Sequence, residues 1–179
     1  MIEREARALL ERLQTEPRRI RLPFGLPGRN ELDAAGRAVR RVDGRWFSGY
    51  DVLKRKAHED VILCANRCPA PPARGPVWVV TRWRERDRRR DPDNIVSGGR
   101  KLILDALGPG RRGLRGWKGA GLLHCDGWHC VAAFVDVFEI GEPAVEVILP
   151  EVQLSLFAVL PAAETVPGRV ELRADLRAP

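Results

Sequence analysis

Two aspartates that follow a run of arginines are the residues of this chain best suited to chemistry. Residues 88–94 read Arg-Arg-Arg-Asp-Pro-Asp-Asn. An extended backbone places Asp91 and Asp93 on the same side, and Pro92 favours that conformation at the residue before it. Close carboxylates repel each other unless a cation lies between them, and hard oxygen ligands suit Mg²⁺ or Mn²⁺. The pattern therefore indicates metal-assisted cleavage of a phosphodiester.

A plainer interpretation of the same residues stays open. Asp91 and Asp93 could form a surface turn in which each carboxylate is ion-paired with a neighbouring arginine. Lys101 could likewise be a solvated helix residue that pairs with Asp105 at the i+4 position. Neither arrangement requires a metal or a nucleic acid.

Length and charge narrow the class of protein. With 179 residues and 44% hydrophobic content, the chain can bury one proper core, so one domain is expected. The net charge of +7 favours an acidic partner such as nucleic acid, although a solvated basic surface explains it equally well. The apolar runs are too short to span a bilayer, and the N-terminus lacks a secretory signal. We therefore expect a cytoplasmic protein with no membrane contact.

The four cysteines are Cys64, Cys68, Cys125 and Cys130. Their spacing does not match a standard zinc knuckle, so no stoichiometric zinc is expected, and a structural zinc site is kept as an alternative. Disulfides are disfavoured as well, because a reducing compartment keeps thiols reduced.

Apolar periodicity predicts the elements that must position the acidic pair. Helices are expected over 2–13, 51–65 and 94–107, and strands over 18–22, 77–84, 131–140, 144–149, 152–159 and 169–176. The strands at 131–140 and 144–149 are predicted to form a hairpin with Gly141 at its turn. Gly98 and Gly99 fall inside the last helix. They indicate either a later helix start or the close approach of a large group.

Three motifs in fixed order carry a resemblance to a known family. They are the segment 88–94, Lys101-Leu-Ile-Leu-Asp105-Ala-Leu107, and Gly121-Leu-Leu-His-Cys-Asp126-Gly-Trp128. Together with the loop at 26–31, they resemble RusA-type Holliday junction resolvases, above all the phage and prophage versions. The resemblance covers roughly residues 20–149. It implies an α+β fold, in which a mixed sheet packs with two main helices, a homodimer, and Mg²⁺-dependent symmetric nicking of four-way DNA.

The expected elements and the resemblance together divide the chain, and the resemblance assigns roles to residues within the middle part. Residues 1–17 would be an N-terminal helix, 18–149 the nuclease domain, and 150–179 a C-terminal strand extension. Asp91, Asp93 and Asp126 match the family's metal-binding aspartates. Lys101 matches the catalytic lysine when counted back from Asp105. Counted forward from Asp93, that position falls on Ser97, and Arg100 is a rival.

Basic side chains around this site are expected to bind DNA phosphates without reading sequence. The polar and basic residues predicted to contact DNA are Arg82, Arg84, Arg86, Arg88, Arg89, Arg90, Asn94, Arg100, Arg111 and Arg112. Trp117 and Trp128 could stack on unpaired bases, although core packing is the commoner role of tryptophan.

The function expected from these observations is a structure-selective endodeoxyribonuclease that resolves Holliday junctions. It would use Mg²⁺, with Mn²⁺ as a substitute, and no nucleotide cofactor. Two alternatives remain. One is a nuclease for flaps, forks or other branched DNA, and the other is a non-catalytic DNA-binding protein, perhaps stabilised by zinc. Metal dependence separates the nucleases from the binding protein.

Overall fold

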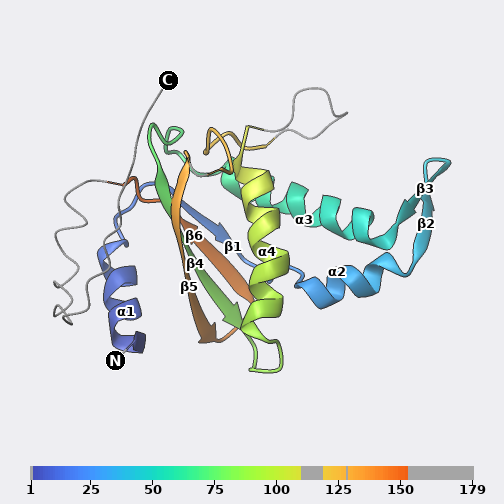
Figure 1. Cartoon of the computed structure of the whole chain (residues 1–179), viewed down its shortest axis with the longest axis horizontal. Coiled ribbons are helices and arrows are strands. Elements are labelled where there is room, and N and C mark those ends of the chain that lie inside the picture. The colour runs from blue at the N-terminus through green and yellow to red at the C-terminus, as the bar shows by residue number, and fades with distance from the viewer. Residues whose placement is uncertain (1, 110–118, 128, 153–179) are drawn as a thin grey trace, which may run out of the picture.

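A four-stranded mixed sheet with helices on both sides forms the body of the protein (Figure 1). The computed structural model describes residues 2–109, 119–127 and 129–152. The α+β class expected from the sequence is confirmed. In chain order the elements are α1 (Ile2–Arg12), β1 (Arg19–Leu22), α2 (Arg29–Gly36), β2 (Val39–Val42), β3 (Arg45–Ser48), α3 (Gly49–Ala65), β4 (Val77–Glu85), α4 (Pro92–Leu107), β5 (Val131–Ile140) and β6 (Ala144–Ile148).

Strand β4 lies inside the sheet, and this position overturns the predicted hairpin. The strand order is β1-β6-β4-β5, so β5 and β6 do not pair with each other. β5 runs parallel to β4 on one side, whereas β6 runs antiparallel to it on the other. Val79, Val80 and Thr81 are consecutive and all buried, which is typical of a strand covered on both faces. The fold therefore pairs β4 with a strand on each of its edges instead of pairing β5 with β6, its neighbour in the sequence.

The short link between β5 and β6 passes over the end of β4. There the N–H of Gly141 donates to the Glu85 carbonyl (2.8 Å). A methyl group at Gly141 would lie 2.7 Å from the Arg84 side chain, which explains the glycine. The glycine predicted to end a hairpin instead lets the chain cross a neighbouring strand.

The main core lies between the sheet and helices α3 and α4. Trp83 and Val79 of β4 are buried against Leu102 and Leu107 of α4, with Val61 of α3 completing the cluster. The predicted helices at 51–65 and 94–107 are confirmed, and each begins two residues earlier than expected. Helix α1 lies on the other side of the sheet (Figure 1).

The segment between β1 and α3 contains structure that was not predicted. The loop expected at residues 26–31 gives way to helix α2 at Arg29. Strands β2 and β3 then form an antiparallel two-stranded sheet of their own. Figure 1 shows these two strands projecting away from the main sheet, beyond the ends of α2 and α3.

Several predictions fall outside the residues that the structure describes. They are the strands expected at 152–159 and 169–176, apart from Val152, and the residues Arg111, Arg112, Trp117 and Trp128. Among the described helices, none combines the length and the apolar character that crossing a membrane requires.

Candidate functional site

The acidic pair lies at the start of α4 rather than on a strand. Asp91 is the residue that caps the helix, and its side chain accepts a hydrogen bond from the Asp93 N–H (3.1 Å). Pro92 is the first helical residue, a position where its fixed φ and missing N–H suit the helix. The predicted strand-like alternation of Asp91 and Asp93 is therefore wrong, because capping preferences decide the local backbone.

Both aspartates are exposed, and neither forms an ion pair with a described residue. The adjacent arginines bind other carboxylates instead. Arg89 pairs with Asp87 (3.5 Å), while Arg90 pairs with Glu85 (2.7 Å) and Glu31 (2.9 Å). The turn in which arginines neutralise the acidic pair is thus not the arrangement adopted here.

Arg90 and Asn94 connect the acidic pair's helix to the N-terminal loop. Besides its two carboxylate partners, Arg90 donates to the carbonyl of Leu26 (2.9 Å). The side-chain oxygen of Asn94 accepts from the backbone N–H of Asn30 in the first turn of α2 (2.6 Å). Both residues were predicted to bind DNA, but their described contacts hold α2 and its preceding loop against α4.

Two glycines in α4 allow this close packing. A methyl group at Gly98 would lie 2.5 Å from the carbonyl carbon of Gly28 and 2.7 Å from the oxygen of Pro27. At Gly99 it would lie 2.6 Å from the ring of Trp83. Of the two explanations for this glycine pair, the close approach of a large group is confirmed.

Lys101 lies farther along α4, between two carboxylates. Its Nζ is 2.5 Å from Asp105 and 3.5 Å from Asp126. The hydrogen bond to Asp105 and the negative charge of both partners raise the pKa of Lys101, so the ammonium is charged at neutral pH. The pairing with Asp105 at i+4 is as expected, and Asp126 is a second partner.

The two rivals of Lys101 lie in other surroundings. Arg100 forms an ion pair with Asp136 of β5, and its guanidinium lies 4.5 Å from the centre of the Phe134 ring. Ser97 is exposed, and its hydroxyl donates to the carbonyl of Asn94 (3.4 Å). Only Lys101 of the three lies beside Asp126.

The three aspartates do not form one cluster. Among the described residues, no group of three or more His, Cys, Asp or Glu side chains converges closely enough to hold a metal ion. Asp91 and Asp93 share the start of α4, whereas Asp126 contacts Lys101 about two turns further along. The arrangement consists of an exposed pair of carboxylates and a separate lysine-aspartate contact.

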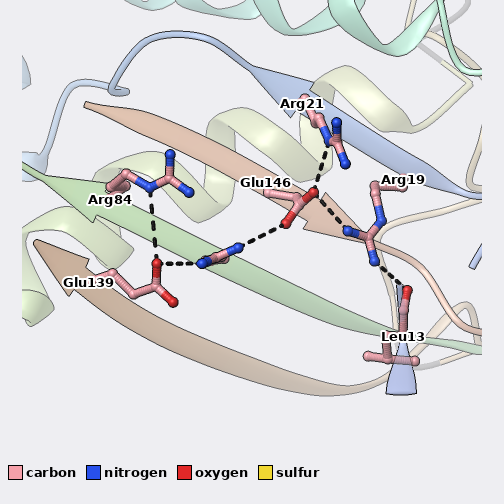
Figure 2. A network of polar contacts seen from close by, with 7 residues as sticks. Leu13, Arg19, Arg21, Arg84, Glu139 and Glu146 are labelled. Carbon is pink, nitrogen blue, oxygen red and sulfur yellow. Dashed lines mark hydrogen bonds and ion pairs between the residues drawn. The ribbon is translucent and has the colours of Figure 1, made fainter. Parts of the chain in front are cut away.

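The predicted arginine strip is split between two places. Arg86, Arg88 and Arg89 are exposed in the turn between β4 and α4. Arg82 and Arg84 instead lie on the face of the sheet opposite α4, where both contact Glu139 (2.7 and 4.0 Å). Figure 2 shows Arg84 and Glu139 on this face. Their distance from the acidic pair's helix follows from strand alternation, which turns every second side chain of β4 to this face.

Acidic partners that were not predicted neutralise much of this opposite face. Glu146 of β6 contacts Arg19 (3.0 Å) and Arg21 (3.1 Å), as Figure 2 shows. It also contacts Arg82 (3.8 Å). The hydrogen bond with Glu139 raises the pKa of Arg82. In the sequence, Arg19 and Arg21 alternate with apolar residues in β1 and Glu146 lies between two valines in β6, but this pattern does not show that the two strands pair.

The cysteines are arranged differently from the expectation. Cys125 and Cys130 form a disulfide with a Cα–Cα distance of 5.6 Å, so the prediction that disulfides are absent is wrong. A turn in which the N–H of Cys130 donates to the carbonyl of Gly127 (2.9 Å) brings the two cysteines together, whatever the compartment. Cys64 is free and buried, and burial raises the pKa of its thiol.

Comparison with known proteins adds no family assignment. No protein-family model matches the chain, and no curated protein matches it.

Proposed function

We propose that this chain is a Mg²⁺-dependent endodeoxyribonuclease that nicks four-way DNA junctions. One observation carries the proposal. Asp91 and Asp93 are exposed and unneutralised by described residues, although three exposed arginines lie within five residues of Asp91. Pairing these exposed charges with each other would contribute only about 0–1 kcal/mol to stability. A site for a cation and a phosphate, in contrast, needs both kinds of charge accessible.

The acidic pair fits the way in which proteins hold Mg²⁺. This ion keeps several water ligands and is usually bound by one or two carboxylates together with substrate phosphates. Asp91 uses one oxygen for the helix cap, and neither oxygen of Asp93 accepts a hydrogen bond from a described residue. When bound, the ion would polarise a phosphate and activate a water molecule.

The chain's own residues supply the remaining contacts. Arg86, Arg88 and Arg89 would bind the DNA backbone on the approach to the acidic pair, without reading bases. Lys101 is charged and 56% exposed, so it can contact a strand that follows the exposed face of α4. Asp126 would then position Lys101.

A second copy of the chain is part of the proposal, because resolving a junction requires two matched nicks and one chain offers one acidic pair. Strand β5 is the surface best suited to it. β5 is an edge strand of ten residues, and Phe134, Phe138 and Ile140 are 40%, 40% and 58% exposed. A long apolar edge strand favours pairing with another strand.

The proposed dimer can be tested with one substitution that introduces a charge into β5. Wild-type protein at micromolar concentration should scatter light as a dimer. Phe138→Lys should scatter as a monomer, because lysine would place an unpaired charge in the contact. Leu63→Lys, at an even more exposed apolar residue of α3, is the control and should remain dimeric. A monomeric wild type, or a dimeric Phe138→Lys, would exclude β5 as the contact.

Substrate preference tests the proposed activity. In Mg²⁺, the protein should nick a four-way junction at matched positions in opposing strands and leave an unbranched duplex intact. Equal cleavage of a splayed duplex would assign it to branched DNA in general. Tight binding of all these DNAs without any nick would identify a non-catalytic binding protein.

A further inference from the structure

The arm formed by residues 37–48, which contains β2 and β3, exposes apolar and cationic side chains together. Trp46 is 70% exposed and Val39 is 64% exposed. Arg41 lies opposite Trp46 in the strand pairing, and its guanidinium is 6.0 Å from the centre of the Trp46 ring. A two-stranded hairpin is only marginally stable alone. We therefore expect the exposed tryptophan to contact a binding partner.

The charge of the arm indicates what kind of partner it fits. The sequence of residues 37–48 contains one acidic residue, Asp43, and four arginines, which are Arg37, Arg40, Arg41 and Arg45. Arg41 and Arg37 form no ion pair with any described side chain. The exposed Trp46 ring beside the guanidinium group of Arg41 suits a strand that offers both bases and phosphates.

The arm is held in a defined direction relative to the helices. Its turn is an Asp43-Gly44 pair with φ of 49° and 76°, the backbone that tight hairpins favour. At its base, the N–H of Gly49 donates to the carbonyl of Ala38 (2.5 Å). Any larger residue at Gly49 is excluded, because a methyl group would lie 2.2 Å from the oxygen of Ala35.

Helix α2 connects the arm to the acidic pair. Its first turn contacts Asn94 in the first turn of α4, and its last turn leads into β2. Eight helical residues span about 12 Å. The arm therefore extends from the acidic pair's end of α4 outward, as Figure 1 shows.

We propose that the arm is a nucleic-acid-binding ribbon, in which Trp46 stacks on an unpaired base and Arg41 binds the adjacent phosphate. It would grip a DNA branch beyond the point of cleavage. The inference deepens the proposed nuclease function and rests on DNA being its ligand. An acidic protein would also fit this surface, because tryptophan and arginine are common at protein interfaces. Arm variants that bind DNA as tightly as the controls would favour that partner.

Binding without cleavage tests the arm. Fluorescence anisotropy of the full chain in EDTA, with labelled single-stranded DNA and a four-way junction, gives affinities and their salt dependence. Trp46→Ala should weaken binding roughly five- to 100-fold, and Trp46→Phe should restore most of it. Arg41→Gln should lower the log–log salt slope by about one.

Matched controls lie at the other end of α3. Leu63→Ala removes an exposed apolar side chain and Arg67→Gln an exposed arginine, and both should bind as wild type. Circular dichroism must show the same folded signal for every variant compared. If Trp46→Ala and Arg41→Gln bind DNA as tightly as the controls, the proposal is overturned.

The outcomes also separate this inference from the proposed function. Loss of binding in the arm variants, with a wild type that never cuts in Mg²⁺, would support the arm and reject the nuclease. Normal binding by the arm variants, with a wild type that does cut, would reject the arm alone. A wild type that binds no DNA would overturn both.

Discussion

Replacing Asp93 with asparagine is expected to reduce junction cleavage at least about 100-fold while leaving junction binding intact. Removing a residue that only hydrogen-bonds to a metal ligand lowers activity roughly 10- to 100-fold. Removing a direct ligand is expected to lower it further. Binding should persist or tighten slightly, because removing a negative charge does not weaken attraction for phosphate. Cleavage and gel-shift assays on the same purified variant measure both quantities.

Two further substitutions make this result specific. Asp91→Asn keeps a good helix cap, because asparagine and aspartate cap equally well, so its loss of cleavage would reflect charge rather than unfolding. Asp87→Asn changes an exposed acid of the same turn that pairs with Arg89, and it should cut normally. Normal turnover by Asp93→Asn at saturating Mg²⁺ would remove the acidic pair from the mechanism.

Gly98→Ala is expected to destabilise the protein by about 1–3 kcal/mol, the usual cost of overpacking. This reverses the ordinary sign, because alanine in a helix normally gains about 1 kcal/mol over glycine. The added methyl group would meet the backbone of Gly28 and Pro27, which cannot rotate away as a side chain could. Urea unfolding followed by circular dichroism measures the difference.

Ser97→Ala is the matched control for this substitution. It lies in the same turn of α4, is exposed, and should change stability by less than about 0.5 kcal/mol. If Gly98→Ala instead stabilises the protein, the loop before α2 does not pack on α4 as described here. The contacts of Arg90 and Asn94 that depend on this packing would then need revision.

The parts of the fold that the sequence predicted well are those with a strong apolar period. β4 combines a run of buried β-branched residues with Trp83, and α4 repeats apolar residues at helical spacing, so both were found. The pairing of β5 with β6 was predicted wrongly. Neighbouring strands separated by a glycine suggest a hairpin, but β4 lies between β5 and β6 and pairs with both.

The segment from α2 to β3 was not predicted, because its many charged and small residues leave no clear apolar periodicity. One signal was available, since Asp43-Gly44 between Val42 and Arg45 is a typical two-residue hairpin turn. The contacts between Glu146 and three arginines depend on a strand order that local patterns do not contain.

For the candidate site, the sequence identified the exposed acidic pair but not its geometry. A proline between two aspartates is compatible with an extended segment and also with a capped helix start, and only the helix that follows decides between them. The position of Asp126 beside Lys101 depends on a loop whose path local patterns do not predict. The resemblance identified the candidate site residues, but only the structure shows how far apart they lie.

Magnesium dependence of junction cleavage tests the central proposal most directly. Purified wild-type protein is freed of metal with EDTA and incubated with an end-labelled four-way junction before and after Mg²⁺ is restored. We expect no cuts in EDTA, and paired nicks on opposing strands once Mg²⁺ is present. No cuts in either condition, or the same cuts in EDTA, would contradict a metal-dependent nuclease built on Asp91 and Asp93.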